Sequence, residues 1–301
     1  MNINIVNFIE QMDFYLFWIG SQDSDIKKFE YYIEVLKFLH FMKVEAKSTL
    51  ELISVIGKEQ IVMDYISRLV DTCMNQDLVR MDLVGLSMHT QESLINLARQ
   101  EFSILSRTYR DINKGEKSEL YSDFEELDYM FHPILQPYFY HPNRTTNQTA
   151  TYFKEFITTF ENKSSYEEFV ESTSKMNQRA FELMAEKTFR NKIGASLHQL
   201  FISNIDYPYS KIYLSHARFE MLKIKKALKL YSFKYGEYPK ELSSLVPEFM
   251  NEVPQNIING GSFYYSLEDQ LISCDEKGVI LNARNRVNIY LSEEARKNDQ
   301  N

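Results

Sequence analysis

Apolar side chains recur every three or four residues along most of the chain as far as Tyr235, and this spacing predicts a body of amphipathic helices. One long run covers 26–56 and ends at Gly57; its apolar stripe consists of Tyr32, Leu36, Leu39 and Met42. Glycines, prolines and polar clusters divide the rest into further segments. The pattern therefore predicts helices over 1–19, 26–56, 58–74, 77–112, 147–161 and 166–191, and a short helix or turn over 195–204.

Local signals mark several ends of these segments. Ser165 and Glu168 stand at the spacing of a capping box, so we expect a helix to begin near residue 166. Gly85 favours a break between 85 and 91 inside the long segment 77–112. We interpret 205–210 as a joint between helices, because Pro208 would interrupt the hydrogen bonds of a helix interior.

The most regular apolar stripe follows this joint and ends in a sharp turn. Its members recur at three and four residues; they are Leu214, Ala217, Met221, Ile224, Leu228, Tyr231 and Tyr235. Gly236 suits the C-terminal cap of this helix, and Pro239 prevents the helix from resuming at once. After a short helix over 241–246, β-prone residues predict a hairpin over 263–267 and 271–274 and a third strand over 279–281.

Composition supports a mainly helical fold. The 301 residues include only nine glycines and seven prolines, fewer than the turns of a strand-rich chain of this length would need. We therefore predict a mainly α fold with a small antiparallel β-sheet near the C-terminus. The predicted parts are a helical body over 1–210, a helix and hairpin module over 211–291, and a polar tail over 292–301.

Charge and hydropathy limit the partners that we expect. The formal net charge of −8 argues against nucleic-acid binding, which depends on clustered positive charge. The sequence has no apolar run of about 18 residues, so we expect no membrane span in this chain. Its N-terminus lacks the basic segment of a signal peptide. Cys73 and Cys274 lack the spacing of a zinc site, and we interpret them as buried thiols; a disulfide between them is the open alternative.

The segment 217–278 carries a recognisable series of turns. Its helix ends at Tyr235, a G-x-Y-P turn occupies 236–239, and an L-x-x-L pair follows at Leu242 and Leu245. The series resembles the soluble C-terminal module of type II secretion major pseudopilins, and it continues at Pro254, Gly260, Tyr265 and 272–278. Asn256 and Ile257 replace the Asp-Pro of that family, and neither its N-terminal transmembrane helix nor its terminal acidic run occurs in this sequence.

The chain as a whole resembles an uncharacterised family of bacterial envelope proteins of planctomycete type, which place a helical body before such a module. Residues 142–145 match the P-N-x-T loop of these proteins. The resemblance implies an extracytoplasmic protein of the bacterial cell envelope with a protein partner there, held by an N-terminal anchor that lies outside this chain. We expect no calcium site, because only Asp269, Asp275 and Glu276 offer carboxylates in the relevant turns.

Candidate reactive residues gather around an aromatic, proline-rich stretch. His132 follows Asp128 at helical spacing, which fits either an acid–base or metal site or a simple histidine–carboxylate pair. The aromatic residues between Pro133 and Pro142 suit an exposed recognition patch, although they could equally fill a core. The predicted patch consists of His132, Tyr138, Phe139, Tyr140 and Asn143, and we expect no catalytic, cofactor-binding or metal-binding residue.

Lysines give the last long helix a basic polar face. They are Lys223, Lys225, Lys226, Lys229 and Lys234. This face could contact an acidic protein or acidic lipid headgroups, and the alternative is an ordinary solvated helix face.

Three functions remain open on the sequence alone. The first is a non-enzymatic structural or assembly protein of the cell envelope that makes contacts through its pseudopilin-like end. The second is a helical peptide- or ligand-binding domain with a cleft near residues 130–145. The third is a hydrolase that uses His132 and the neighbouring carboxylates, although the absence of P-loop, GxGxxG and HExxH motifs argues against an enzyme.

Overall fold

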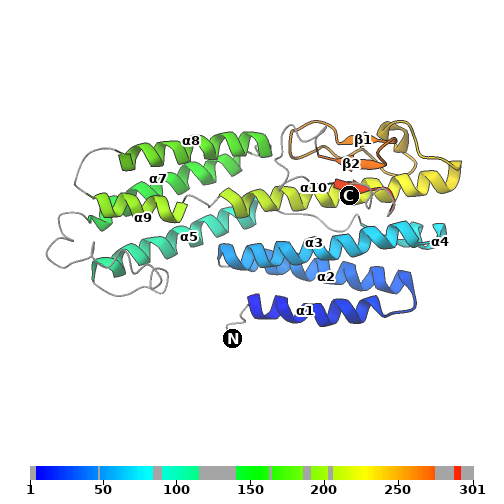
Figure 1. Ribbon diagram of the computed structural model, residues 1–301, viewed down its shortest axis with the longest axis horizontal. Helices are drawn as coiled ribbons and strands as arrows, with labels where there is room; N and C mark the ends of the chain where they lie inside the picture. Colours follow the sequence, from blue (N-terminus) through cyan, green and yellow to red (C-terminus); the bar gives the residue numbers. More distant parts are fainter. Residues whose placement is uncertain are drawn as a thin grey trace.

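The computed structural model describes residues 5–46, 48–83, 90–114, 140–162, 165–185, 191–202, 206–274 and 288–292. Its helices lie roughly side by side in an elongated molecule (Figure 1). The predicted fold class is confirmed, because the chain is mainly helical and carries a small antiparallel sheet near its C-terminus. Two groups of helices stand end to end, and one long helix, α10 (Asp206–Tyr235), begins against the end of one group and runs along the other.

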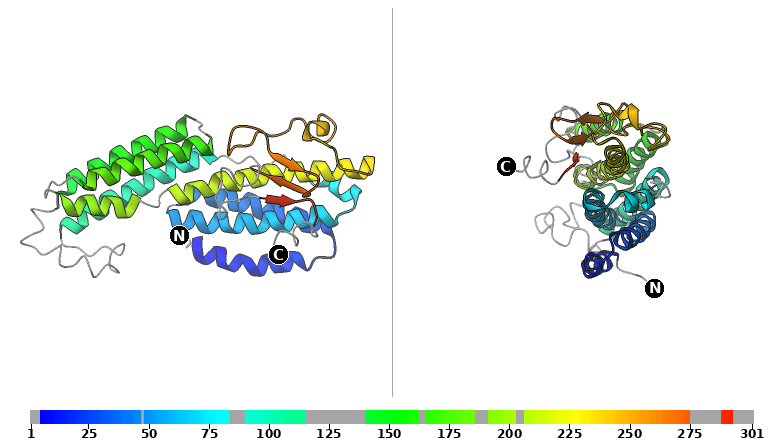
Figure 2. Two further views of the ribbon diagram at one scale, coloured as in Figure 1. Left: turned by 45° about the horizontal axis from the view of Figure 1, so that its top comes forward. Right: turned by 90° about the vertical axis from the view of Figure 1, so that its right-hand side faces the viewer.

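The first group contains α1 (Ile5–Gly20), α2 (Asp25–Glu45), α3 (Thr49–Thr72) and the short α4 (Asn75–Arg80). Helix α3 lies at its centre and packs against α1, α2 and α10. The outermost helix is α1, at the edge of the molecule (Figures 1 and 2). The predicted stripe of α2 is buried throughout at Tyr32, Leu36, Leu39 and Met42.

The break between α2 and α3 corrects the prediction of one helix over 26–56. Ser48 begins α3 as its N-cap, and its hydroxyl accepts a hydrogen bond from the Glu51 backbone N–H at 3.3 Å. Ser48 and Glu51 stand at the spacing of a capping box, which is a local signal for a helix start. Gly57 is predicted to end a helix, but it lies inside α3 on the exposed side. The apolar stripe on the buried side of α3 continues past it.

The second group contains α5 (Thr90–Asn113), α7 (Pro142–Glu161), α8 (Tyr166–Ala185) and α9 (Lys192–Ile202). The predicted capping box at the start of α8 is confirmed, because the Ser165 N–H donates to the Glu168 carboxylate and the Glu168 N–H donates to the Ser165 hydroxyl. Aromatic rings fill the centre of this group; they belong to Phe156, Phe160, Phe169, Tyr209 and Tyr213.

The predicted joint over 205–210 is wrong, since α10 already begins at Asp206. Pro208 falls in the first turn, where backbone N–H groups have no partner within the helix, so proline costs little there. The predicted division between 210 and 211 therefore lies inside α10. The predicted end of this helix is confirmed, because Gly236 follows Tyr235 with a φ of +82° and donates its N–H to the Ser232 carbonyl oxygen.

The C-terminal sheet covers one side of α10. It has the order β1 (Tyr264–Ser266), β2 (Leu271–Ser273) and β3 (Asn288–Tyr290), and both pairings are antiparallel. The predicted hairpin is confirmed, and the short helix expected before it is a single 3₁₀ turn, η2 (Leu242–Leu245). The third strand predicted over 279–281 lies outside the described residues. Cys73 and Cys274 are both buried, and no disulfide joins them.

A buried ion pair between α2 and α3 also receives a hydrogen bond from α10. The Lys43 ammonium of α2 lies 2.8 and 3.0 Å from the two carboxylate oxygens of Glu59 on α3. The Ser215 hydroxyl of α10 donates to the same carboxylate at 3.1 Å. The two charged side chains are 1% and 3% exposed, so this contact replaces the water that both groups would otherwise bind.

Candidate functional site

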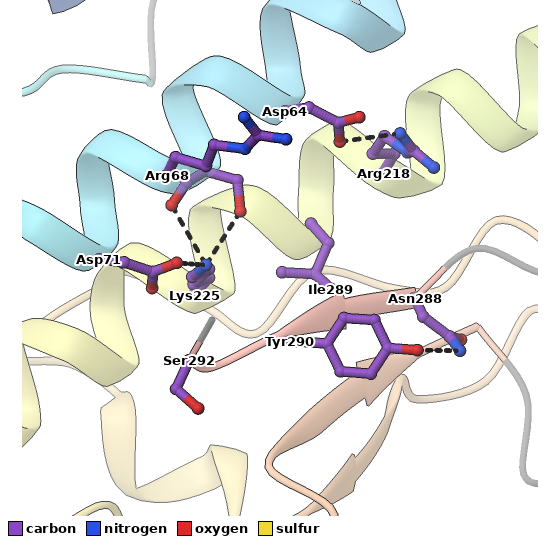
Figure 3. Close-up of a pocket in the computed structure, with 10 residues that line it drawn as sticks. Asp64, Arg68, Asp71, Arg218, Lys225, Asn288, Ile289, Tyr290 and Ser292 are labelled. Carbon is purple, nitrogen blue, oxygen red and sulfur yellow. Dashed lines mark hydrogen bonds and ion pairs between the residues drawn. The ribbon is translucent and has the colours of Figure 1, made fainter. Parts of the chain in front are cut away.

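A polar pocket lies between α3, α10 and β3 (Figure 3). The α3 side chains share one helix face, because positions 64, 67, 68 and 71 follow three- and four-residue spacing. Arg218 and Lys225 lie two turns apart on the facing side of α10, and β3 forms the remaining wall. The pocket has a volume of about 160 Å³ and is lined by Asp64, Ser67, Arg68, Asp71, Arg218, Lys225, Asn288, Ile289, Tyr290 and Ser292.

Ion pairs already occupy much of this lining. The Lys225 ammonium lies 2.8 Å from the Asp71 carboxylate and also donates to the hydroxyl and carbonyl oxygens of Ser67 at 2.9 and 3.2 Å. These contacts use its three N–H donors. Arg218 donates to Asp64 at 3.1 Å. Ligand pockets usually measure about 300–1,000 Å³, so we interpret this smaller space as a charged seam that holds α3 against α10.

A second polar cluster is sealed in the core of the other helix group. The Thr149 hydroxyl of α7 lies 2.9 Å from Nδ1 of His198 on α9 and donates to the Tyr109 hydroxyl of α5 at 3.2 Å. Burial lowers the pKa of His198 to about 4 and raises the pKa of Tyr109 to about 12, so both groups are neutral near pH 7. None of the three side chains is more than 3% exposed, so the cluster belongs to the packed core.

The predicted recognition patch is only partly within the described residues. Tyr140 does not belong to an exposed patch: it is 2% exposed, and its hydroxyl donates to the Tyr109 carbonyl oxygen at 2.6 Å. Asn143 is exposed in the first turn of α7. His132, Tyr138 and Phe139 lie outside the described residues. The cleft near 130–145 and the hydrolase that would use His132 therefore stay predictions.

The lysines of the basic face of α10 contact other groups of the chain and differ in exposure, from the buried Lys225 to the half-exposed Lys234. Lys225 is buried against Asp71, and Lys226 reaches the carbonyl oxygen of Met81. The other lysines contact neighbours along or beside α10: Lys223 with Glu220, Lys229 over the ring of Phe233, and Lys234 with Glu248. These contacts compensate the charges within the chain, which weakens the interpretation of this face as a site for acidic partners.

An exposed group of aromatic side chains on α1 and α2 is the strongest candidate for a functional surface. Phe14 and Phe17, one turn apart on α1, are 82% and 80% exposed. Large apolar side chains at such exposure place unfavourable surface in water unless a partner covers it. We call this surface the α1–α2 aromatic face; it consists of Phe8, Phe14, Tyr15, Phe17, Trp18, Phe38 and Phe41.

Helix α1 exposes these rings because it is apolar on both of its sides. Its inner side buries four residues against α2 and α3 with helical spacing; they are Ile9, Met12, Leu16 and Ile19. Phe14 and Phe17 fall on the opposite side of the helix. The sequence carried this signal, since a helix that is apolar all round normally has a partner on every side, but periodicity alone does not show that α1 is the outermost helix.

Ring contacts hold four other members of the aromatic face in place: Phe8, Tyr15, Trp18 and Phe38. Trp18 stacks on Tyr15 with a centroid distance of 5.4 Å and leans on Tyr31 of α2 at 5.2 Å. Phe8 contacts Phe38 of α2 at 5.4 Å. On its other flank α1 is fixed by Asp13, whose carboxylate lies 2.6 Å from the Lys58 ammonium of α3. The surface is thus preorganised on two packed helices, which lowers the entropy cost of binding.

Comparisons with known protein families, with curated proteins and with solved structures found no match for this chain. Within the described ranges, no helix combines the length and the apolar character that crossing a membrane requires. The same residues include no group of three or more histidine, cysteine, aspartate or glutamate side chains placed to hold a metal ion. We therefore infer the function from the surfaces of this molecule.

Proposed function

We propose that this protein is a non-enzymatic structural or assembly component that docks through the α1–α2 aromatic face. The observation that carries the proposal is the near-complete exposure of Phe14 and Phe17 on a helix that is firmly packed on its other side. Interface cores are enriched in aromatic side chains and poor in charged ones. The α1 sequence matches this composition, since its charged residues are Glu10 and Asp13, and Asp13 is paired with Lys58.

We further propose a location in the bacterial cell envelope, on the extracytoplasmic side. This part of the proposal rests on the resemblance of 217–278 to the pseudopilin module. The helix stop at Gly236 and the hairpin of β1 and β2 are consistent with that resemblance. The docking surface that we propose lies at α1, however, and not at the pseudopilin-like end that the sequence suggested.

Site-specific photocrosslinking in the cells that produce the protein tests the docking surface. The photoreactive amino acid p-benzoylphenylalanine replaces Phe17 in one variant and Phe181 in a matched control. Phe181 is also an exposed phenylalanine, at 53%, but it lies on α8 in the other helix group. We expect covalent adducts from position 17 and not from position 181. Equal adducts from both positions, or none from position 17, would contradict docking through α1.

Fractionation of the same cells tests the location. We expect the protein in the envelope fraction, and recovery from the cytoplasmic fraction alone would contradict this part of the proposal without affecting the docking surface.

A further inference from the structure

We infer that the α1–α2 aromatic face is the interface of a symmetric dimer, in which α1 packs antiparallel against α1 of a second copy of this chain. The inference rests on the proposed docking function and adds the identity of the partner. Three properties of the face support it: its area, the position of the acidic residue on α1 and the absence of basic residues from α1.

The exposed area matches what a dimer interface needs. With about 200 Å² for each aromatic side chain, the exposed fractions of the seven rings leave roughly 750 Å² of aromatic surface uncovered. The largest apolar patch of a typical monomer measures about 300–600 Å², and a standard interface buries about 800 Å² on each partner. The aromatic face thus exceeds an ordinary patch and supplies about one side of a standard interface.

The position of Glu10 favours an antiparallel arrangement. Glu10 lies on the same outer side of α1 as Phe14 and Phe17. In a parallel dimer, the two Glu10 carboxylates would face each other and repel. With a two-fold axis between Phe14 and Phe17, each Glu10 lies opposite Ser21 of the second copy. The two carboxylates are then about 16 Å apart, at a rise of 1.5 Å per residue.

The same residues disfavour a lipid surface as the occupant. Helices that lie in a membrane interface usually carry lysine or arginine on their polar side, and α1 contains neither. On α1 the acidic side chain of Glu10 flanks the aromatic rings, whereas Glu34 of α2 is paired with Lys37 at 2.8 Å. The chain has a net charge of −8. This charge would repel anionic lipid headgroups, whereas an antiparallel dimer keeps the acidic groups at its rim.

Light scattering of the purified protein tests the dimer. At tens of micromolar we expect a molar mass of twice the 35.7 kDa of one chain. The variant F14E/F17E should be monomeric at the same concentration, because the new carboxylates would be buried without partners. The variants F14L/F17L and F181E should remain dimeric, since the first keeps the face apolar and the second adds a charge elsewhere. Circular dichroism of each variant verifies that the helices are intact.

Disulfide trapping tests the direction of packing. A mixture of E10C and S21C proteins should form disulfide-linked dimers on mild oxidation, because an antiparallel arrangement brings these positions together. E10C alone should not, since a disulfide needs Cα atoms within about 7 Å. The native Cys73 and Cys274 thiols are buried and do not interfere. Rapid linking of E10C alone would overturn the antiparallel arrangement.

The remaining outcomes separate the dimer from the docking function. A monomeric wild type that gives adducts with a different protein from position 17 in cells would overturn the dimer and leave the docking proposal intact. A monomeric wild type that floats with phosphatidylcholine vesicles, while F14E/F17E does not, would overturn the dimer in favour of a lipid surface. A monomer without any adduct from position 17 would overturn both proposals.

Discussion

His198 lies in the core of α5, α7 and α9 as a neutral imidazole. Its ring packs edge-on against Tyr152 with a centroid distance of 6.0 Å, and the Thr149 hydroxyl contacts its Nδ1. Desolvation penalises the imidazolium ion, which is why burial lowers the pKa of His198 from 6.5 to about 4. Protonation in the folded protein would place an unpaired charge in this core.

This pKa shift makes stability depend on pH in a defined window. Below pH 6.5 the unfolded chain binds a proton at His198 that the folded chain does not bind, so the free energy of unfolding falls as the pH falls toward about 4. From about pH 7.5 to about pH 4.5 we expect H198L to lose about 2.5 kcal/mol less stability than the wild type. Urea unfolding at both pH values measures the difference. H141L, which removes an exposed imidazole, serves as the control, and an equal effect of both variants would exclude a role for burial.

Gly194 allows α9 to approach α7 closely. A Cβ atom at this position would clash with the Thr145 hydroxyl and the Asn191 side chain. The Asn191 amide oxygen accepts hydrogen bonds from the His141 N–H at 2.7 Å and from the Thr145 hydroxyl at 3.2 Å, so it cannot move freely. We expect G194A to lower the free energy of unfolding by about 2–3 kcal/mol.

The matched control for G194A is G57A. Gly57 lies on the exposed side of α3, and no atom outside the helix backbone comes within 4 Å of the position that an alanine methyl group would take. Alanine should therefore raise the free energy of unfolding by about 0.5–1 kcal/mol through its higher helix propensity. Chemical denaturation compares the two variants, and a loss of stability in both would show that close packing at Gly194 is not the cause.

The burial of Tyr140 could not be predicted from the sequence. Tyr140 could be assigned equally to a surface patch or to a core, because aromatic side chains beside prolines occur in both. Its burial depends on contact with Tyr109, 31 residues earlier, and no local pattern encodes such a contact. The capping box at Ser165 was predictable because both of its partners lie within one turn.

At the scale of elements, the pair of Lys43 and Glu59 links α2 to α3. Removal of one partner leaves the other charge buried, so we expect E59Q to lower the free energy of unfolding by about 3–5 kcal/mol. The double variant K43M/E59M should recover most of this loss. The exposed pair of Lys37 and Glu34 gives the comparison, and E34Q should cost less than about 1 kcal/mol. Equal losses for E59Q and E34Q in thermal and chemical unfolding would refute the assignment.

The helices themselves are predictable where their apolar stripes are long and regular, as in α10. Their ends are less so. Pro208 suggests a joint, although a proline in the first turn of a helix breaks no hydrogen bond. The boundary before α3 escapes the periodicity because apolar residues recur at helical spacing on both sides of it, at Met42 and again at Leu52. Only the polar signal of Ser48 and Glu51 marks the new start.

At the scale of the whole molecule, α10 belongs to both helix groups. Its first turns pack Tyr209 against Phe156 of α7 at a centroid distance of 4.7 Å, and farther along Ser215 and Lys225 contact α3. Loss of the first contact should therefore weaken the distant group as well. We expect F156A to lower the free energy of unfolding by about 3–5 kcal/mol.

Two optical probes can follow this coupling. The single tryptophan, Trp18, reports on the first group, whereas circular dichroism reports on all helices. Both transitions of F156A should shift together. F181A, at an exposed position of α8, should leave both nearly unchanged. An unshifted Trp18 transition beside a two-step dichroism curve would show that the groups unfold independently.

The fold class followed from the periodicity of the chain, but the candidate surface did not. Phe14 and Phe17 have the same residue type as the buried rings of α7, and only the assembled molecule shows that α1 is its outermost helix. The resemblance at 217–278 predicted contacts through the C-terminal end of the chain. The largest exposed aromatic surface among the described residues lies instead at the N-terminal end.

The late position of α10 in the chain has a consequence for biosynthesis. Translation proceeds from the N-terminus, so α1 to α9 leave the ribosome before the helix that completes both of their cores. Until Tyr235 has emerged, the α10-facing side of α3 and the aromatic rings of α7 and α8 lack their final cover. A nascent chain of this protein therefore presents apolar surface for most of its synthesis, and chaperone binding during translation should fall sharply once α10 is exposed.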